Sequence, residues 1–354
     1  MIHINSNKIV QFVCANISGC SFYRIRWNAQ YLVSFADQTG VMPVITNDIL
    51  FDKLDKTASF VIEGAFTFID QIKKLKELQS KFGYKIIYEI DDLVWNIPEY
   101  NTATSHQINY YEKVKEVLPY IDRVIVSTEY LKRCFERDFD YHAVHVVPNA
   151  VPQFLFNKRK EPIKEKIIKP KVLYTGAPQH FRQPSPIIQL PNGQIQTGIT
   201  PLYGDWNKEW IDFIIDNVKN DKIEFICFCV IPWFFEEIKD KIKCIPWTDC
   251  NSFPDLVMSQ NADFYIAPLQ DNEFNKCKSN IKLLEASIMG IPFIGDKFLF
   301  SPYEYTITNI KDFWKYTEPD EYNKIVQWQY KYIEQTNGYI SKEYHLNNLL
   351  IGVI

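Results

Sequence analysis

Short β-type apolar runs alternate with helical patterns along this chain of 354 residues, and the alternation occurs twice. Strands that are separated by helices pair in parallel, because each crossover helix returns the chain to the same edge of the sheet. The pattern therefore predicts an α/β fold with two Rossmann-like, doubly wound domains. The expected strands are 8–14, 41–46, 59–63, 84–90, 123–127 and 143–147 in the first half, and 171–175, 223–229, 243–245, 263–267 and 292–295 in the second.

A charged, proline-punctuated stretch separates the two halves. Residues 158–171 read KRKEPIKEKIIKPK and show no apolar period. We interpret this stretch as a solvated hinge, with a nucleic-acid-binding arm as the alternative. At about 150 residues per domain the length fits two domains. The expected division is 1–155, a linker at 156–170, and 171–334, with a last helical segment at about 335–354 that could pack back on the first domain.

Composition excludes several classes of protein. The net charge is 39 − 43 = −4, which argues against a protein that mainly holds nucleic acid through a basic surface. The 8 cysteines form no CxxC pair, which indicates reduced thiols and no metal cluster. The longest apolar stretch, 226–235, is too short to span a membrane. We therefore expect a cytoplasmic protein without a membrane span. With only 12 glycines, a glycine-rich phosphate loop is not expected.

The segment 270–295, which follows an expected strand, has the strongest chemical pattern. Lys278, Lys282 and Glu285 stand at i, i+4 and i+7, so they would share one face of a helix that begins near Ser279. Two ammonium groups, a hydroxyl and the free N–H groups of a helix start suit a diphosphate, and Glu285 could accept hydrogen bonds from ribose hydroxyls. The alternative is an ordinary surface ladder of charges.

The residues of this segment, PLxxNxFNxxKSNxKxLEAxxxGxPxI from position 268, resemble the nucleotide-binding segment of GT-B glycosyltransferases of the retaining family-four type. Stretches 127–132, 146–151 and 172–177 extend the resemblance in the expected order. Glu285 matches the second Glu of the family's E-x7-E signature, and Cys277 stands where the first Glu would be. Lys278, Ser279, Asn280 and Lys282 resemble a variant found in a phage and bacterial branch.

Two further strand ends carry candidate residues, because ligands of open parallel sheets bind beyond the carboxyl ends of the strands. Gly19 would let the backbone approach a donor, and Tyr23 and Arg24 begin the next helix; a plain turn is the alternative. Asp91 and Asp92 follow a buried strand, and one of them is expected to face the cleft. That carboxylate could orient the acceptor hydroxyl, take its proton or stabilise positive charge on the sugar.

Several residues are weaker candidates. Residues 178–206 are expected to form a long irregular loop after a strand that ends at Gly176, a candidate for donor binding. His180 and Arg182 of this loop could reach the donor phosphates, as the resemblance implies for a basic residue; the alternative is that both are surface residues of the loop. Trp247 and Thr248 would lie beside the nucleobase, as the resemblance implies. Aromatic residues near the acidic loop are candidate acceptor contacts, although most aromatic residues should serve packing: Trp95, Tyr100, Tyr110 and Tyr111.

Together these features predict a retaining glycosyltransferase with two domains facing across a cleft, in which Asp91, Asp92 and Lys282 are the catalytic candidates. The co-substrate would be a nucleoside-diphosphate sugar, in particular a UDP-sugar, and no cofactor is expected. The resemblance implies that no metal is needed, because basic residues neutralise the diphosphate; metal binding at the two aspartates is the alternative. The acceptor stays open between a hydroxymethylated base in phage DNA, a surface glycan and a protein. A scaffold that only binds nucleotide sugar is the competing class.

Overall fold

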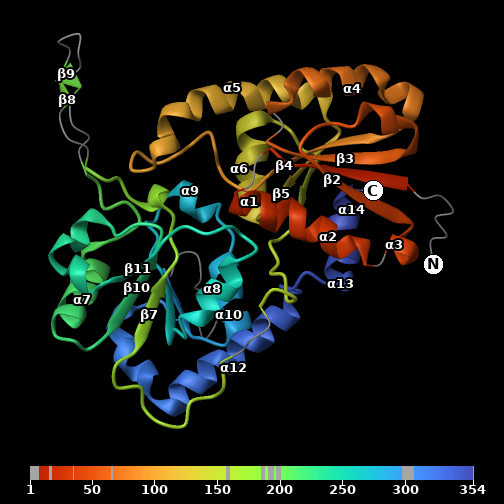
Figure 1. Cartoon of the computed structure of the whole chain (residues 1–354). Coiled ribbons are helices and arrows are strands. Elements are labelled where there is room, and N and C mark those ends of the chain that lie inside the picture. Colours follow the sequence, from red (N-terminus) through yellow and green to blue (C-terminus); the bar gives the residue numbers. More distant parts are fainter. Residues whose placement is uncertain are drawn as a thin grey trace.

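The computed structural model describes residues 8–15, 18–34, 36–64, 67–156, 160–184, 188–189, 195–196, 201–296 and 307–353. They form two α/β domains, each built on a parallel sheet, and the predicted fold class is thereby confirmed. In Figure 1 the first domain runs from red to yellow at the upper right, and the second is green to blue at the lower left.

The first sheet has six parallel strands in the order β2-β1-β3-β4-β5-β6. Parallel strands with helices on both faces read as near-continuous apolar runs, and β3 and β4 show this pattern. The strands are β1 (Lys8–Val13), β2 (Val41–Thr46), β3 (Thr57–Glu63), β4 (Lys85–Ile90), β5 (Arg123–Val126) and β6 (Val144–Val146). The helices are α1 (Gly19–Ser21), α2 (Trp27–Val33), α3 (Ala36–Thr39), α4 (Ile69–Phe82), α5 (Gln107–Val117) and α6 (Glu129–Phe139), and a π-turn spans Phe22–Arg26.

Alternate side chains of these strands enter two separate cores. Phe60 and Ile62 pack under α4, α5 and α6, whereas Val61 packs on the opposite face against α2 and the C-terminal helices. Figure 1 shows α4 and α5 along one face of the sheet and α2 and α14 along the other. Both faces of the sheet are therefore covered, and its strand ends are left as the surface where a ligand can bind.

The second sheet has five parallel strands in the order β11-β10-β7-β12-β13, a doubly wound arrangement whose direction of winding reverses between β7 and β12. Ligands bind at such a reversal, outside the carboxyl ends of the strands. The strands are β7 (Lys171–Tyr174), β10 (Glu224–Phe228), β11 (Lys243–Ile245), β12 (Phe264–Ala267) and β13 (Phe293–Gly295). The helices are α7 (Lys208–Lys219), α8 (Phe253–Ser259), α9 (Glu273–Lys276), α10 (Ile281–Met289) and α12 (Pro319–Gln335).

The stretch 178–206 contains more regular structure than its composition indicates. A single 3-10 turn, Pro178–His180, opens it, and β8 (Ile188–Gln189) pairs antiparallel with β9 (Ile195–Gln196). The prediction of a wholly irregular loop is wrong for these residues, because two Ile-Gln pairs form the rungs of a short hairpin. The remaining residues of 185–200 lie outside the described part of the chain.

The chain returns to the first domain at its C-terminal end. After α12, the Val151 N–H donates to the Gly338 carbonyl at 2.8 Å, and the Ile340 N–H donates to the Val151 carbonyl at 2.9 Å. The short helices α13 (Lys342–Tyr344) and α14 (Leu350–Val353) follow beside the first sheet (Figure 1). His345, between them, places Nε2 2.9 Å from the Asn28 carbonyl oxygen. The two domains are therefore joined by two crossings of the chain.

A buried ion pair fixes the turn that enters the cleft. Arg24 Nε lies 2.6 Å from Glu89 Oε1, and both side chains are 2% exposed. Arg24 Nη1 also donates to the Val147 carbonyl at 2.6 Å and to Asn149 Oδ1 at 2.7 Å. Burial raises the pKa of Glu89 to about 8, and Arg24 opposes that rise. Arg24 therefore ties the π-turn to β4 and to the chain beyond β6.

Substituting Arg24→Met tests this role. The variant leaves the Glu89 carboxyl buried without its cation, so the pKa of Glu89 rises further. We expect the free energy of unfolding to fall by about 3 kcal/mol at pH 9, where the wild-type carboxylate is ionised and paired, and by less at pH 6. Urea titrations followed by circular dichroism measure both values. In a protein that also carries Glu89→Gln, the loss of unfolding free energy should be nearly the same at pH 9 and pH 6. An equal loss at both pH values in Arg24→Met alone would contradict this role of Arg24.

Candidate functional site

A cavity of about 810 Å³ lies between the two domains at the carboxyl ends of both sheets. Its wall is formed by the turn after β1, the acidic loop after β4, and the segments that follow β7 and β12. This volume lies within the range of small-molecule sites in proteins. Most of the residues singled out from the sequence line it: Gly19, Tyr23, Asp91, Asp92, Gly176, His180, Trp247, Thr248, Lys278, Ser279, Lys282 and Glu285.

Tyr110 lines the cavity as well, whereas six other candidate residues are absent from its wall: Arg24, Trp95, Tyr100, Tyr111, Arg182 and Asn280. Trp95 is 9% exposed and donates from Nε1 to Asp138 Oδ2 at 2.7 Å, within the first core. Asn280 donates from Nδ2 to the Tyr332 hydroxyl at 2.5 Å. Arg182 pairs with Glu99 of the first domain, Nη2 to Oε1, at 3.0 Å. The structure thus gives these side chains packing and interdomain contacts.

Helix α10 begins later than its charge pattern indicates. The helix was expected to start near Ser279, but its first residue is Ile281, because Asn280 has a non-helical backbone (φ −84°, ψ 25°). Lys278 and Ser279 therefore belong to the preceding loop, and only Lys282 and Glu285 lie on the helix. The prediction that Lys278, Lys282 and Glu285 share one helix face is wrong, although all three line the cavity.

The two lysines have different electrostatic surroundings. Lys278 Nζ lies 3.7 Å from Asp92 Oδ1, and although burial lowers its pKa, the charges of Asp92 and Asp205 outweigh that effect and raise it. Lys282 donates to Thr175 Oγ1 at 2.9 Å and to the Thr175 carbonyl at 3.1 Å. Burial lowers the pKa of Lys282, and the neighbouring Lys278 lowers it further. An anionic ligand would raise the pKa of Lys282 again, since a negative charge nearby favours the ammonium form.

Glu285 links the domains through two tyrosine hydroxyls. Its Oε1 accepts a hydrogen bond from the hydroxyl of Tyr23, in the first domain, and its Oε2 accepts one from Tyr265 at 2.6 Å. Burial raises the pKa of both tyrosines, and the charge of Glu285 adds to the rise, so both hydroxyls act as donors. The two hydroxyls occupy two of the roughly four acceptor sites of the carboxylate, and Tyr23, which lines the cavity with Glu285, holds one that a ligand could take.

Ser279 contacts the first domain through a residue that the sequence analysis did not select. Its Oγ accepts a hydrogen bond from Asn149 Nδ2 at 2.7 Å. Asn149 in turn accepts from Arg24 at 2.7 Å. Asn149 lies in the stretch 146–151, which was noted for its resemblance, and that was the only available signal for it. The buried Arg24–Glu89 pair thus positions Ser279 from a distance.

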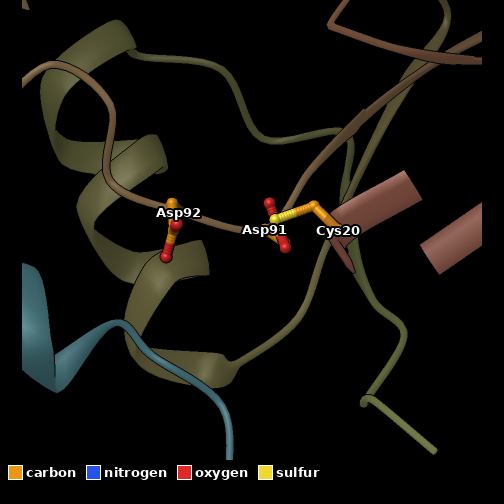
Figure 2. A group of neighbouring side chains, drawn as sticks. All are labelled: Cys20, Asp91 and Asp92. Atoms are coloured by element: carbon orange, nitrogen blue, oxygen red, sulfur yellow. The ribbon is translucent and has the colours of Figure 1, made fainter. Parts of the chain in front are cut away.

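The acidic loop holds two carboxylates that point in different directions (Figure 2). Asp91 accepts a hydrogen bond from the Cys20 thiol, and Asp92 faces Lys278. Burial raises the pKa of Asp91 to about 6, the charge of Asp92 adds to the rise, and Arg24 opposes it. Near neutral pH Asp91 is therefore close to the point where it can take up a proton.

The same loop is where a metal ion could be held. Cys20, Asp91 and Asp92 each offer a ligand atom, and these atoms lie within 4.8 Å of one another. The charge of Asp91, followed by burial, raises the pKa of the Cys20 thiol well above its usual value. Cysteine binds a metal ion as the thiolate, and a bound cation would itself offset the Asp91 charge that raises this pKa, so metal binding at the two aspartates stays the alternative.

Two of the glycines that line the cavity, Gly19 and Gly176, differ in the space around them. A Cβ added to Gly176 would lie 1.8 Å from the Tyr174 hydroxyl oxygen, so packing inside the second domain requires glycine there. A Cβ added to Gly19 would meet nothing within 4 Å. The space beside Gly19 therefore belongs to the cavity and is available to a bound molecule.

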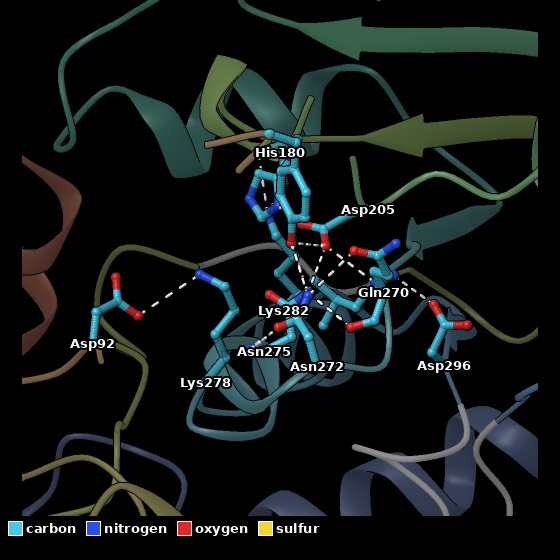
Figure 3. A network of polar contacts seen from close by, with 12 residues as sticks. Asp92, His180, Asp205, Gln270, Asn272, Asn275, Lys278, Lys282 and Asp296 are labelled. Atoms are coloured by element: carbon cyan, nitrogen blue, oxygen red, sulfur yellow. Dashed lines mark hydrogen bonds and ion pairs between the residues drawn. The ribbon is translucent and has the colours of Figure 1, made fainter. Parts of the chain in front are cut away.

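His180 is held by a buried carboxylate that the sequence analysis also missed. Its Nδ1 lies 2.6 Å from Asp205 Oδ2, and Figure 3 shows the imidazole ring next to that carboxylate. The side chain of Asp205 is 1% exposed. It comes from a loop that shows no pattern in the sequence, so only the folded arrangement reveals it.

The segment that carries the lysines also contacts the first domain. Arg137 Nη1 lies 2.6 Å from Glu273 Oε1, and Thr128 Oγ1 donates to the Cys277 carbonyl at 2.9 Å. The Cys277 side chain is fully buried, with its sulfur 3.7 Å from that of Cys134. Cys277 does not line the cavity, although it stands where the resembling family has its first Glu.

The fold, rather than the sequence, relates this chain to known proteins. No family model and no curated protein matches the sequence. Among solved structures, alpha-glucosyltransferase (AGT) in complex with UDP matches with a TM-score of 0.55 and 11% identity, over 93% of this chain and 95% of that chain. Anabaena Alr3699/HepE in complex with UDP and glucose matches with a TM-score of 0.49 and 10% identity, over 97% and 94%. The AGT likeness confirms the GT-B arrangement of two facing domains.

Among the described residues, no helix combines the length and apolar character needed to cross a bilayer.

A titration of Asp91 tests the electrostatics of the acidic loop. We expect the 13C resonance of its carboxyl group to titrate near pH 6, well above its ordinary value of 3.8, because of burial and the adjacent charge. Asp92→Asn should lower this midpoint because it removes a negative neighbour, and Lys278→Ala should raise it. A wild-type midpoint near the ordinary value would show that Asp91 is solvated and that the loop has another conformation.

Proposed function

We propose that this protein is a glycosyltransferase that moves a sugar from a nucleoside-diphosphate sugar to an acceptor hydroxyl in the cavity between its domains. One observation carries the proposal: Lys278, Ser279, Lys282 and Glu285 line the same cavity as Asp91 of the facing domain. Cations suited to a leaving diphosphate thus lie opposite a carboxyl group suited to an attacking hydroxyl. The solved structure of AGT contains UDP, which supports a uridine nucleotide as the carrier.

The donor would lie along the segment after β12. Lys278, Ser279 and Lys282 would bind the diphosphate and stabilise the negative charge that grows on it as the sugar departs. Glu285 would accept hydrogen bonds from the ribose hydroxyls after displacing Tyr23. Trp247, which is 68% exposed, and Thr248 would border the nucleobase at the far end of the cavity.

We propose retention of configuration by attack on the face from which the diphosphate leaves. The family resemblance supports this course, in which an oxygen of the departing phosphate accepts the proton of the acceptor hydroxyl. Asp91 would orient that hydroxyl and balance positive charge on the sugar. Asp92, which faces Lys278, would hold that lysine toward the diphosphate.

We propose a hydroxymethylated base of phage DNA as the acceptor, on the strength of the Lys-Ser-Asn-x-Lys variant. The first-domain wall of the cavity carries Glu63, Asp91 and Asp92, which disfavour a phosphate group inside. A base turned out of its duplex would present a neutral hydroxyl there and leave the phosphates outside. A surface glycan or a protein is the alternative acceptor, and a module that binds nucleotide sugar without turnover is the alternative class.

A panel of nucleotide sugars tests the proposal. We expect slow hydrolysis of a UDP-sugar by the protein alone and faster consumption when hydroxymethylated DNA is added. Unmodified DNA of the same sequence is the matched control. Acceleration by a glycan or a protein instead of DNA would overturn the acceptor, and binding without any consumption would indicate the inactive module.

Lys282→Ala should lower turnover about 100-fold or more, because the diphosphate loses a preorganised positive charge. Folding should be intact, since the ammonium group donates hydrogen bonds to Thr175 alone among the described residues and otherwise lies over the Tyr265 ring. Steady-state kinetics and thermal unfolding measure the two effects. Lys276→Ala removes a lysine that pairs with Asp271 and serves as the control. Normal turnover in Lys282→Ala would show that the diphosphate binds elsewhere.

Tyr23→Phe should tighten UDP binding about fivefold, corresponding to the roughly 1 kcal/mol net value of one hydrogen bond. The ribose would then reach Glu285 without displacing a hydroxyl. Isothermal titration calorimetry of wild type, Tyr23→Phe and the control Tyr130→Phe gives the comparison, because Tyr130 is a partly buried tyrosine outside the cavity wall. Weaker binding by Tyr23→Phe alone would mean that the hydroxyl contacts the nucleotide rather than occupying its place.

A further inference from the structure

Asp205 is a buried carboxylate with an unusually full set of hydrogen bonds. Its Oδ2 lies 2.6 Å from His180 Nδ1. Its Oδ1 accepts from the Tyr100 hydroxyl at 2.6 Å, from Asn275 Nδ2 at 2.5 Å and from the Gln270 N–H at 3.1 Å. Four donors surround one carboxylate, so the site is built for the ionised form of Asp205.

The hydrogen bonds fix the proton on the imidazole ring of His180. An ionised carboxylate only accepts, so Nδ1 of His180 carries the hydrogen and Nε2 carries the lone pair. Burial raises the pKa of Asp205, but the bond from His180 and the other donors outweigh that rise and keep it below its usual range. Burial also lowers the pKa of His180, although Asp205 opposes the effect, and the charges of Lys278 and Lys282 lower it further.

The second ring nitrogen of His180, Nε2, is the one that does not contact Asp205. His180 lines the cavity wall together with Lys278 and Lys282. In the ranges that the structure describes, the hydrogen bond to Asp205 is the only one made by the His180 ring, so Nε2 is available to a bound molecule. The groups that set the charge of His180 are Asp205 on one side and the two lysines on the other.

The support of this pair comes from both domains. Tyr100 belongs to the loop after β4 in the first domain, whereas Asp205, His180 and Asn275 belong to the second. The Tyr100 hydroxyl also accepts from Asn275 Nδ2 at 3.0 Å. Figure 3 shows the polar groups converging on Asp205, with the Lys278 side chain extending toward Asp92. The geometry around Asp205 is therefore complete only when the two domains are together.

We propose that Asp205 is a positioning residue for the transfer reaction, which holds His180 with Nε2 facing the donor diphosphate, and that Tyr100 makes this arrangement depend on domain closure. The inference rests on the proposed function. When the diphosphate binds, its negative charge offsets Lys278 and Lys282, so His180 takes up one proton from solvent. The imidazolium then donates a hydrogen bond from Nε2 to a diphosphate oxygen. The proton returns to solvent when the nucleoside diphosphate dissociates.

The ring nitrogens of His180 give the first test, in the wild-type protein and without turnover. We expect 15N NMR to show Nδ1 protonated and Nε2 bare in the free protein at pH 7, and both nitrogens protonated when UDP is bound. Calorimetry with UDP in two buffers of different ionisation enthalpy should report uptake of about one proton, as expected for a single histidine. A free protein with the hydrogen on Nε2, or no change on UDP binding, would overturn the inference.

Kinetics of two variants give the second test. Asp205→Asn should lower kcat about tenfold to 100-fold with little change in KM, as for other groups that orient a histidine, and should move the hydrogen of His180 to Nε2. The alkaline limb of the pH–rate profile of Asp205→Asn should shift to lower pH, because the carboxylate that stabilises the His180 imidazolium is gone. Tyr100→Phe keeps the Asp205–His180 bond and should lower kcat less, without changing the tautomer. Asp212→Asn, which removes a surface ion pair with Lys208, is the control.

These outcomes separate the inference from the proposed function. If Asp205→Asn does not fold, the tautomer of His180 in the wild-type protein and the kinetics of Tyr100→Phe still test whether Asp205 positions His180. Turnover that depends on Lys282 but is unchanged in both variants would overturn the role of Asp205 alone. A wild-type protein that binds no nucleoside diphosphate would overturn the proposed function and, with it, the role of Asp205 in transfer.

Discussion

One segment of the second domain forms both the domain interface and the wall of the cavity, and the rest of the site depends on this double use. Between positions 272 and 285, side chains contact the first domain at nearly every turn, while Lys278, Ser279, Lys282 and Glu285 line the cavity. These contacts include Asn272 and Asn275 with Tyr100, Glu273 with Arg137 and Asn96, Cys277 with Thr128 and Cys134, Lys278 with Asp92, Ser279 with Asn149, and Glu285 with Tyr23. The site is therefore assembled when the two domains come into contact along this segment.

This arrangement explains why the two lysines of the cavity favour an anionic ligand. Burial lowers the pKa of Lys282, whereas Lys278 is stabilised by carboxylates across the cleft. A ligand with negative charge would compensate both lysines and at the same time sit between the domains that hold them. The lysines of the second domain and the carboxylates of the first thus both serve ligand binding. The buried Arg24–Glu89 pair holds the first-domain wall of the cavity in place.

The sequence predicts the fold well because the alternation of strands and helices is a local pattern repeated many times. The lysine-bearing segment was also found, since its residues are close together along the chain. The start of α10 was misplaced by two residues, because Asn280 leaves the helical conformation. Asp205 and Cys20 could not be selected, because their partners come from distant positions that only the folded chain brings near. For Asn149 the resemblance of the stretch 146–151 was the only signal. The aromatic candidates Trp95 and Tyr100 turned out to be buried, which an excess of aromatic residues does not reveal.

A crystal structure with bound UDP tests the central claim most directly. The account predicts the diphosphate against Lys278, Ser279 and Lys282, the ribose on Glu285 in place of the Tyr23 hydroxyl, and the two domains in contact along the 272–285 segment. UDP bound away from this segment, or UDP in the cavity with the Tyr23–Glu285 hydrogen bond intact and the lysines unengaged, would contradict it.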